Sequence, residues 1–409
     1  MTMCYAAPVR PLLLPLLLLI AGCAGSRSVL PISAAVPVAE ASVSFDRAGE
    51  RGSYAQGLAD PRTGRAITID DPVRIASISK LVVAIGVLRL VEQGRIDLHS
   101  DVSQWLGWPL RNPAYPDRPI TLSMLLSHTS SMRDGLDYAI PLGATVQGTV
   151  NSPQAWDKHH PPGSFFIYSN LNFPVVASVV QRVTGERFDR WMRTNVLDPL
   201  QVDACFNWPT CSEHAVARAA VLTQHGQPLH DDLRGRRPAC PVRTLADGHC
   251  DLGRWSEVEN GALFSPQGGL RISARGLARI GRMLLNEGTL DGIRILSPQS
   301  VESLMTPVWR FDGRNGDTDH GFYCTYGLAS HRIPTPLAGC DDDIAGDGRA
   351  RIGHGGDAYG LRSGLWIDRG SGTGVAFFVT GLPDSPPRGR SAFRAAEEAA
   401  FKRAMAKPE

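Results

Sequence analysis

A serine and a lysine three positions apart are the residues of this sequence best suited to chemistry. Ser77 and Lys80 lie in RIASISKLVVAIGVLRLVEQGRIDL, residues 74–98, whose apolar spacing predicts an amphipathic helix. Positions i and i+3 share one helix face, so the amine should lie beside the hydroxyl. At a helix start, unpaired N–H groups favour an alkoxide on Ser77, while the same field and apolar burial disfavour a charge on Lys80. A neutral amine could then take the serine proton, which predicts a nucleophile with its base.

The rarity of lysine gives this pair more weight. The chain has 42 basic residues, of which only Lys80, Lys158, Lys402 and Lys407 are lysines. Arginine does not deprotonate in proteins and could not serve as the base. The alternative is a lysine that extends its ammonium from the helix edge to solvent. Because serine is common, a chance Ser-x-x-Lys has a probability of about one in four in this chain.

A second segment, PPGSFFIYSNLNF, carries a phenol and an amide two residues apart. In an extended chain Tyr168 and Asn170 point the same way. Tyr168 could pass a proton between nucleophile and leaving group, and Asn170 could bind a substrate carbonyl or Lys80. The alternative is a tyrosine packed in the core with a hydrogen-bonded hydroxyl.

A third segment, IGHGGDAYG, places two glycines after a histidine at the end of a strand-like run. Gly355 and Gly356 leave room for a substrate backbone to pair with the strand edge beyond His354. The N–H of Asp357 could join that of Ser77 as an oxyanion hole. The alternative is an ordinary glycine turn.

Composition and other motifs exclude several classes of function. The net charge of +2 over 409 residues gives no sign of a nucleic-acid partner. The chain has neither Gly-x-Ser-x-Gly nor His-Glu-x-x-His. His159 and His160 point apart if extended, and the acidic CDDDIAGDG lacks the spacing of a calcium loop. We therefore expect no metal and no cofactor.

The N-terminus is typical of a targeting segment. MTMCYAAPVRPLLLPLLLLIAGC has a short basic region and an apolar stretch too short to span a bilayer. Ile-Ala-Gly-Cys at its end resembles a bacterial lipoprotein cleavage box, which would make Cys23 the lipidated first residue; the alternative is an ordinary signal peptide. Ala24 in place of Asp favours, by resemblance, the outer membrane facing the periplasm. We expect a signal peptide at 1–23, a flexible tether at 24–42 and anchoring by lipid.

Six further cysteines remain, an even number that indicates disulfides in an exported protein. Fifteen pairings are possible. Pairing of nearest neighbours closes three short loops and is favoured; none of the three spacings is Cys-x-x-Cys, which disfavours a zinc or redox site. The favoured pairs are Cys205–Cys211, Cys240–Cys250 and Cys324–Cys340.

The elements that must position these residues form a mixed α/β pattern. Strand-like runs lie near both ends, and helical runs lie between them, which predicts an antiparallel sheet built from both termini and flanked by helices. We expect residues 43–100 and 266–409 to form an α/β domain and residues 101–265 a mainly helical inserted domain. The cleft between the two is the expected place for the site.

Ser-x-x-Lys, Tyr-Ser-Asn and His-Gly-Gly, in this order, resemble the motifs of the penicillin-recognising serine hydrolases. The similarity is to the class C β-lactamase and DD-peptidase branch, including its esterases, and covers about residues 43–405, with LLSHTSS and SPQGGLRISARGLARIGRMLLNEG as agreeing flanks. It implies an acylated nucleophile at Ser77, an acid–base pair of Lys80 and Tyr168, and assistance from Asn170 and His354. No class A deacylating glutamate is in place, so Tyr168 or Lys80 must activate the water.

The third motif departs from the Lys-Thr-Gly that most β-lactamases of this branch have. Gly355 supplies no hydroxyl, and His354 would carry a charge only near or below a pKa of about 6.5. We therefore expect ester or amide hydrolysis on a small molecule or peptide, with peptidoglycan fragments among the candidates, and weaker turnover of carboxylate-bearing substrates as pH rises. The alternatives are a true β-lactamase or DD-carboxypeptidase, and a non-catalytic envelope-binding lipoprotein.

Overall fold

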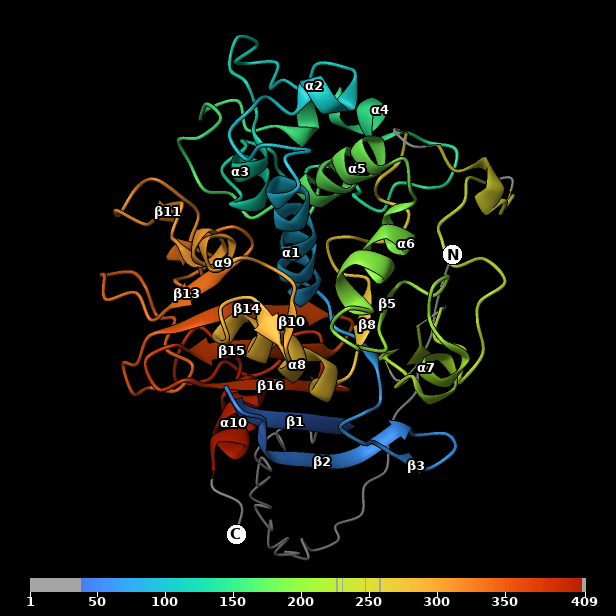
Figure 1. Ribbon diagram of the computed structural model, residues 1–409, viewed down its shortest axis with the longest axis vertical. Helices are drawn as coiled ribbons and strands as arrows, with labels where there is room; N and C mark the ends of the chain where they lie inside the picture. Colours follow the sequence, from blue (N-terminus) through green and yellow to red (C-terminus); the bar gives the residue numbers. More distant parts are fainter. Residues whose placement is uncertain (1–37, 226, 230, 247, 257–258, 407–409) are drawn as a thin grey trace, which may run out of the picture. The chain divides into compact units, whose positions relative to one another are not determined.

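The two ends of the sequence meet in one antiparallel sheet, as expected (Figure 1). The structure, a computed structural model, describes residues 38–225, 227–229, 231–246, 248–256 and 259–406, so the signal peptide and Cys23 lie outside the described residues. Within these ranges nine strands follow the order β11-β12-β13-β14-β15-β16-β1-β2-β3. Their bounds are β1 Ala39–Asp46, β2 Glu50–Asp60, β3 Arg65–Ala66, β11 Trp309–Arg310, β12 Thr325–Tyr326, β13 His331–Ile333, β14 Arg351–Ala358, β15 Leu361–Asp368 and β16 Thr373–Thr380.

The first strand corrects one boundary from the sequence. β1 begins at Ala39, inside the stretch 24–42 that was expected to be a tether. Ala39 pairs with Thr380 of β16 and is buried, as is Ala41, so these small residues belong to the core and not to a linker.

Both faces of the sheet are apolar and each is covered by a helix. On β16, Ala376 and Phe378 pack in the main core with α8 (Ala274–Leu285), while the alternate residues Val375 and Phe377 pack in a second cluster with α10 (Ala395–Met405). Successive strand residues point to opposite faces, so a near-continuous apolar strand is expected at the centre of such a layered structure.

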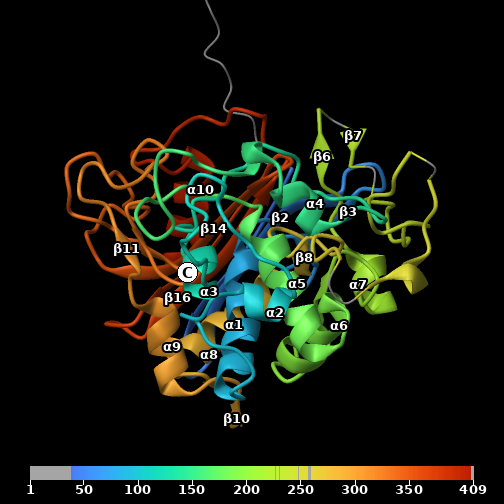
Figure 2. The same ribbon diagram turned by 90° about the horizontal axis from the view of Figure 1, so that it is seen from above.

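The helix that carries the serine and lysine, α1 (Ile78–Glu92), is buried on almost every side and is not the amphipathic helix predicted. It contacts β14, β15 and α9 (Pro298–Met305), which lies beside it in both views (Figures 1 and 2). A side chain on Gly86 would collide with Met192, so glycine allows the close approach of the segment that carries Met192. A helix buried all round has no solvated edge for a lysine, which removes the alternative of an ammonium extended into water.

A short three-stranded sheet, β4-β8-β5, fixes the start of α1. Its strands are β4 Val73–Arg74, β5 Cys205–Phe206 and β8 Leu270–Ile272. The N–H of Ile75 donates to Leu270 O at 2.9 Å, and the N–H of Leu270 donates to Ser79 Oγ at 3.0 Å. Residues 267–270 are thereby held beside the first turn of the helix.

Residues 101–265, expected to be mainly helical, contain mostly short helices joined by long loops. Among the described α-helices of this stretch, only α5 exceeds two turns. The division into two domains stays a prediction. The remaining elements are α2 Ser103–Leu106, α3 Leu122–Leu126, α4 Val146–Val150, η1 Pro153–Ala155, α5 Asn172–Thr184, α6 Phe188–Met192, η2 Arg193–Leu197, α7 Glu213–Arg218, β6 Thr223–Gln224, β7 Gln227–Pro228, η3 Leu252–Arg254, β9 Thr289–Leu290 and β10 Ile293–Arg294.

The six cysteines pair in the order favoured from the sequence. The disulfides join Cys205 to Cys211, Cys240 to Cys250 and Cys324 to Cys340. In the part of the chain that the structure describes, no helix has the length and hydrophobicity needed to cross a bilayer.

Candidate active site

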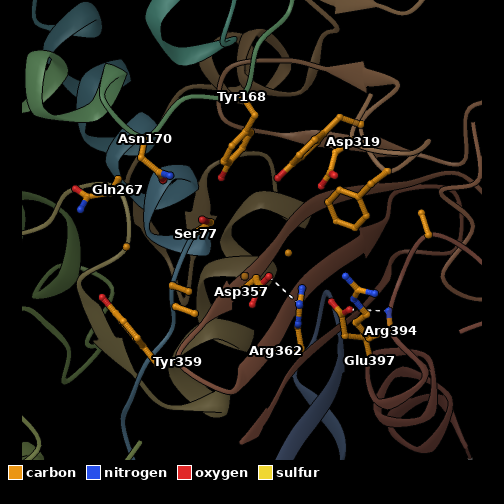
Figure 3. Close-up of a pocket in the computed structure, with 18 of the residues that line it drawn as sticks. Ser77, Tyr168, Asn170, Gln267, Asp319, Asp357, Tyr359, Arg362, Arg394 and Glu397 are labelled. Carbon is orange, nitrogen blue, oxygen red and sulfur yellow. Dashed lines mark hydrogen bonds and ion pairs between the residues drawn. The ribbon is translucent and has the colours of Figure 1, made fainter. Parts of the chain in front are cut away.

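Ser77 stands at the N-terminus of α1 with its hydroxyl directed away from the helix cap. It occupies the N-cap position, but its side chain makes no capping hydrogen bond, and it lines a cleft of about 520 Å³ (Figure 3). Ala76 before it has a φ of +57°, a strained conformation for a residue with a side chain. This turn directs Ser77 into the cleft.

Lys80 reaches Ser77 from inside the helix. Its Nζ lies 3.0 Å from Ser77 Oγ, 2.8 Å from Asn170 Oδ1 and 2.8 Å from the carbonyl oxygen of Gln267. Burial lowers the pKa of Lys80 to about 7, although the charge of Asp134 acts in the opposite direction. Near neutral pH a large share of the amine is therefore uncharged and able to accept a proton from the serine hydroxyl.

Tyr168 lies above the same serine, between two aromatic rings. Its ring centroid is 4.2 Å from that of His128 and 4.7 Å from that of Tyr323. Burial raises the pKa of Tyr168 above its usual range, so the phenol is neutral at pH 7, although the neighbouring hydroxyls of Ser77 and Tyr323 act in the opposite direction and lower that pKa. Tyr168, Asn170 and Ser77 all project into one space (Figure 3).

An aspartate that sequence reasoning missed holds the Tyr-Ser-Asn segment. Asp134 Oδ1 accepts from Ser169 Oγ at 2.9 Å and from Leu171 N at 3.0 Å. Its Oδ2 accepts from Asn170 N at 3.0 Å and from Asn170 Nδ2 at 2.8 Å. Bonding of the Asn170 amide nitrogen to Asp134 turns the amide oxygen towards Lys80, so Asp134 orients a ligand of the amine.

The substitution Asp134→Asn is expected to reduce kcat/KM by about 100-fold, because four donors lose the charged acceptor that fixes Asn170. It should also move the rise of activity with pH to lower pH, since the charge of Asp134 raises the pKa of Lys80. Hydrolysis assays across pH would measure both. Asp137→Asn, which removes an exposed carboxylate paired with Arg243, is the matched control and should change neither. An unshifted profile in Asp134→Asn would contradict this electrostatic role.

The glycine segment of β14 forms the opposite wall of the cleft. Gly355, Gly356 and Asp357 line it, and β13 pairs with β14 only from Arg351 to Gly353 among the described residues. A Cβ on Gly356 would lie 2.5 Å from the carbonyl oxygen of Ile75, so glycine is required for β14 to pack against the residues before Ser77. Gly355 has room for a side chain, and the role of the Asp357 N–H as an oxyanion donor stays a prediction.

His354 differs from its expected role as a titrating cation near the substrate. The ring is 1% exposed and does not line the cleft. Its Nδ1 bonds the carbonyl of Gly355, so the proton is on Nδ1, and Nε2 accepts from the Tyr326 hydroxyl at 2.8 Å. Burial, with help from the charge of Lys80, lowers the pKa of His354 to about 3. The imidazole is therefore neutral at physiological pH and supports the strand.

The far end of the cleft carries paired charges. Arg362 forms a 2.7 Å ion pair with Asp357, and Arg394 and Glu397 lie next to them (Figure 3). Burial raises the pKa of Glu397 to about 7. Among the described residues no group of three or more His, Cys, Asp or Glu side chains could hold a metal ion.

Comparisons with curated proteins give one family and several distant relatives. A family model described as Beta-lactamase matches residues 32–400. Protein Rv1367c of Mycobacterium tuberculosis is 25% identical over 61% of this chain and 63% of its own length. Penicillin-binding protein 4 of Amycolatopsis lactamdurans is 27% identical over 67% and 66%, and esterase EstB of Burkholderia gladioli is 32% identical over 37% and 42%. The matched stretches thus cover less than two thirds of each relative.

Solved structures share the fold over most of the described chain. The octameric penicillin-binding protein homologue from Pyrococcus abyssi has a TM-score of 0.64 at 18% identity, covering 90% of this chain and 73% of that one. A class C beta lactamase from Rhodobacter sphaeroides has 0.63 at 17%, covering 90% and 95%. D-amino acid amidase from Ochrobactrum anthropi SV3 has 0.62 at 20%, covering 90% and 94%. At these identities the likeness shows the fold.

Proposed function

The chain belongs to the beta-lactamase family, and from this premise we propose that it is a serine hydrolase that cleaves an ester or amide through an acyl-enzyme. The observation that supports the proposal most directly is the 3.0 Å contact between Lys80 Nζ and Ser77 Oγ inside a cleft, with the pKa of the amine lowered to about 7. Nucleophile and base are thus in reach, and the base is uncharged when it is needed.

Acylation would proceed in two proton transfers. Lys80 takes the hydroxyl proton as Ser77 Oγ attacks the carbonyl carbon, and the N–H groups of Ser77 and Asp357 are the proposed donors to the oxyanion. Tyr168 then gives its proton to the leaving alcohol or amine as the carbonyl reforms. The products of this half are an acyl-Ser77 ester, a Lys80 ammonium and a Tyr168 phenolate.

Deacylation would reverse these roles with water. The Tyr168 phenolate takes a proton from water, and the resulting hydroxide attacks the acyl carbon. Lys80 returns its proton to Ser77 Oγ as the carboxylic acid departs, which restores the starting enzyme. Deacylation by this route needs no catalytic glutamate to activate the water.

The third motif favours uncharged esters or amides as substrates over β-lactams. His354 is neutral and buried, Gly355 offers no hydroxyl, and the nearby Arg362 is already paired with Asp357. Among the residues of β14, all of which the structure describes, a free substrate carboxylate would find no unpaired cation. The names of the esterase, the penicillin-binding protein and the D-amino acid amidase among the similar proteins agree with an esterase or D-amino-acid amidase type.

The proposal is tested by an acylating probe together with a substrate panel. Intact-mass measurement of the wild-type protein after treatment with a fluorophosphonate should show one adduct, and peptide mapping should place it on Ser77. Hydrolysis of p-nitrophenyl esters or D-amino-acid amides should exceed that of nitrocefin. Absence of any covalent adduct would reject the proposal and favour a binding lipoprotein, whereas efficient nitrocefin turnover would indicate a β-lactamase.

The pH profiles of carboxylate-bearing and neutral ester substrates should be the same in shape between pH 5 and 9. A pKa near 3 keeps His354 neutral over this whole range, so substrate carboxylates meet no changing charge there. Measuring kcat/KM for a matched pair, an ester and its analogue with a carboxylate, checks this. A selective loss of the carboxylate substrate above pH 6 would instead show that the histidine titrates.

We also propose that the protein is exported and anchored to the outer membrane by lipid on Cys23, on the basis of the N-terminal sequence alone. Membrane fractionation of the full chain and its Cys23→Ala variant would separate an anchored from a released protein.

A further inference from the structure

A second phenol stands against Tyr168 at the wall of the cleft. The rings of Tyr323 and Tyr168 are stacked, with centroids 4.7 Å apart and planes 12° from parallel. Tyr323 lines the cleft, and its N–H donates to Thr318 O at 2.8 Å. The next residue, Cys324, is buried and bonded to Cys340, so this segment is firmly held.

We propose that Tyr323 is a positioning residue for the hydrolysis: its hydroxyl donates to the Tyr168 oxygen and stabilises the phenolate formed when Tyr168 protonates the leaving group. This inference rests on the proposed acyl-enzyme function. The Tyr168 oxygen is buried and has no regular hydrogen-bond partner in the described structure, so a donor beside it has an open acceptor to serve.

The direction of the interaction agrees with a donor at position 323. The contact with Tyr323 lowers the pKa of Tyr168. Burial raises the pKa of Tyr323 well above its usual range, and the contact with Tyr168 raises it further. A hydrogen bond acts this way when the second phenol keeps its proton and the first accepts. Tyr323 therefore stays protonated while Tyr168 gives its proton away.

Two other groups around Tyr168, Ser77 and His354, cannot supply this hydrogen bond after acylation. The Ser77 oxygen has become an ester oxygen and has no proton to donate. His128 is neutral because burial lowers its pKa, and since its Nδ1 accepts from Ser169 N at 3.1 Å, its proton is on Nε2, which has no partner among the described residues and is a second candidate donor. His354 is also neutral and uses its Nε2 for Tyr326. The Lys80 ammonium, 5.0 Å from the Tyr168 ring centroid, places a positive charge near the phenolate.

The consequence is a dependence on the leaving group. A p-nitrophenolate departs without needing a proton, but an alkoxide or an amine requires one from Tyr168. Removal of the Tyr323 hydroxyl makes Tyr168 a weaker acid and slows only the reactions that depend on its proton. The substitution Tyr323→Phe keeps the stacked ring and deletes one oxygen.

The test compares kcat/KM of wild type and Tyr323→Phe for esters of one acid with alcohols of increasing basicity. We expect at most about a threefold loss for the p-nitrophenyl ester and about 30-fold or more for the alkyl ester. The ratio of the two losses does not depend on the folded fraction, because unfolded molecules lower both rates equally. Tyr326→Phe deletes a buried hydroxyl from the same segment and should give equal losses for all esters.

The outcomes separate the two proposals. In a plot of log kcat/KM against the pKa of the leaving alcohol, parallel lines for wild type and Tyr323→Phe would overturn the role of Tyr323 while leaving the proposed acyl-enzyme mechanism intact. A steeper decline of kcat/KM with alcohol basicity in Tyr323→Phe, but not in Tyr326→Phe, would support that role. If the wild-type protein forms no adduct and cleaves no ester, the proposed function itself has failed.

Discussion

Alanine at position 77 is expected to lower kcat/KM for ester hydrolysis by at least about 10⁴-fold and to abolish labelling by a fluorophosphonate. The hydroxyl is the only atom of Ser77 that could form the acyl bond, and water is a poor replacement for it. Folding should be unaffected, because the Ser77 side chain does not cap α1. The thermal midpoint of Ser77→Ala should therefore lie close to that of wild type.

A second serine of the same cleft is the matched control for this result. Ser265 lines the cleft with Ser77, but no contact joins it to Lys80 in the described structure. Ser265→Ala should retain labelling and turnover within a few-fold of wild type. Labelling that survives in Ser77→Ala would place the nucleophile elsewhere and end the proposal, whereas ligand binding that persists in Ser77→Ala without turnover in wild type would indicate a receptor.

The parts of this fold that could be predicted are those with local signals. Strand-like runs marked β14, β15 and β16 near one end, and short alternating runs with turn signals marked the β1–β2 hairpin near the other. The glycine after SARGLARIGRMLLNE marked the end of α8. The spacing of Ser77 and Lys80 alone predicts a contact, because two residues three positions apart in a helix lie on the same face and close together. The structure agrees, at 3.0 Å.

The parts that could not be predicted depend on contacts between distant segments. Asp134 meets Asn170 across 36 positions, and nothing in SMRDG distinguishes it from a solvated aspartate. Likewise the burial of His354 follows from the aromatic packing of Tyr326 against it. The neutral state of His354 could not be predicted from the His-Gly-Gly motif, since the side chain of a strand histidine can point to the solvated or to the buried face of the sheet. The position of Tyr323 beside Tyr168 could not be predicted either, because it depends on ring stacking between segments far apart in the sequence.

Arginine at position 80 is expected to reduce kcat/KM by about 10³-fold or more, the second largest effect after loss of the nucleophile. A guanidinium keeps its proton at every accessible pH and cannot accept one from Ser77. Since a permanent charge in this buried position also weakens the fold, Lys80→Met is the companion variant: it fills the space, carries no charge and has no basic nitrogen. The exposed Lys158→Arg is the matched control and should have full activity.

The pH dependence of the wild type decides whether Lys80 is the base. The folded pKa of about 7 lies below the ordinary 10.5, so the reactive neutral amine is scarce at pH 6 and dominant above about pH 8. The plot of kcat/KM should rise about tenfold per pH unit below 7 and then level off. The residual rates of Lys80→Met and Lys80→Arg should lack this rise. If Lys80→Met kept both the rise and a tenth of the rate, a group other than Lys80 would have to accept the proton of Ser77, and the buried amine would serve only to hold Asn170 and the 267–268 loop in place.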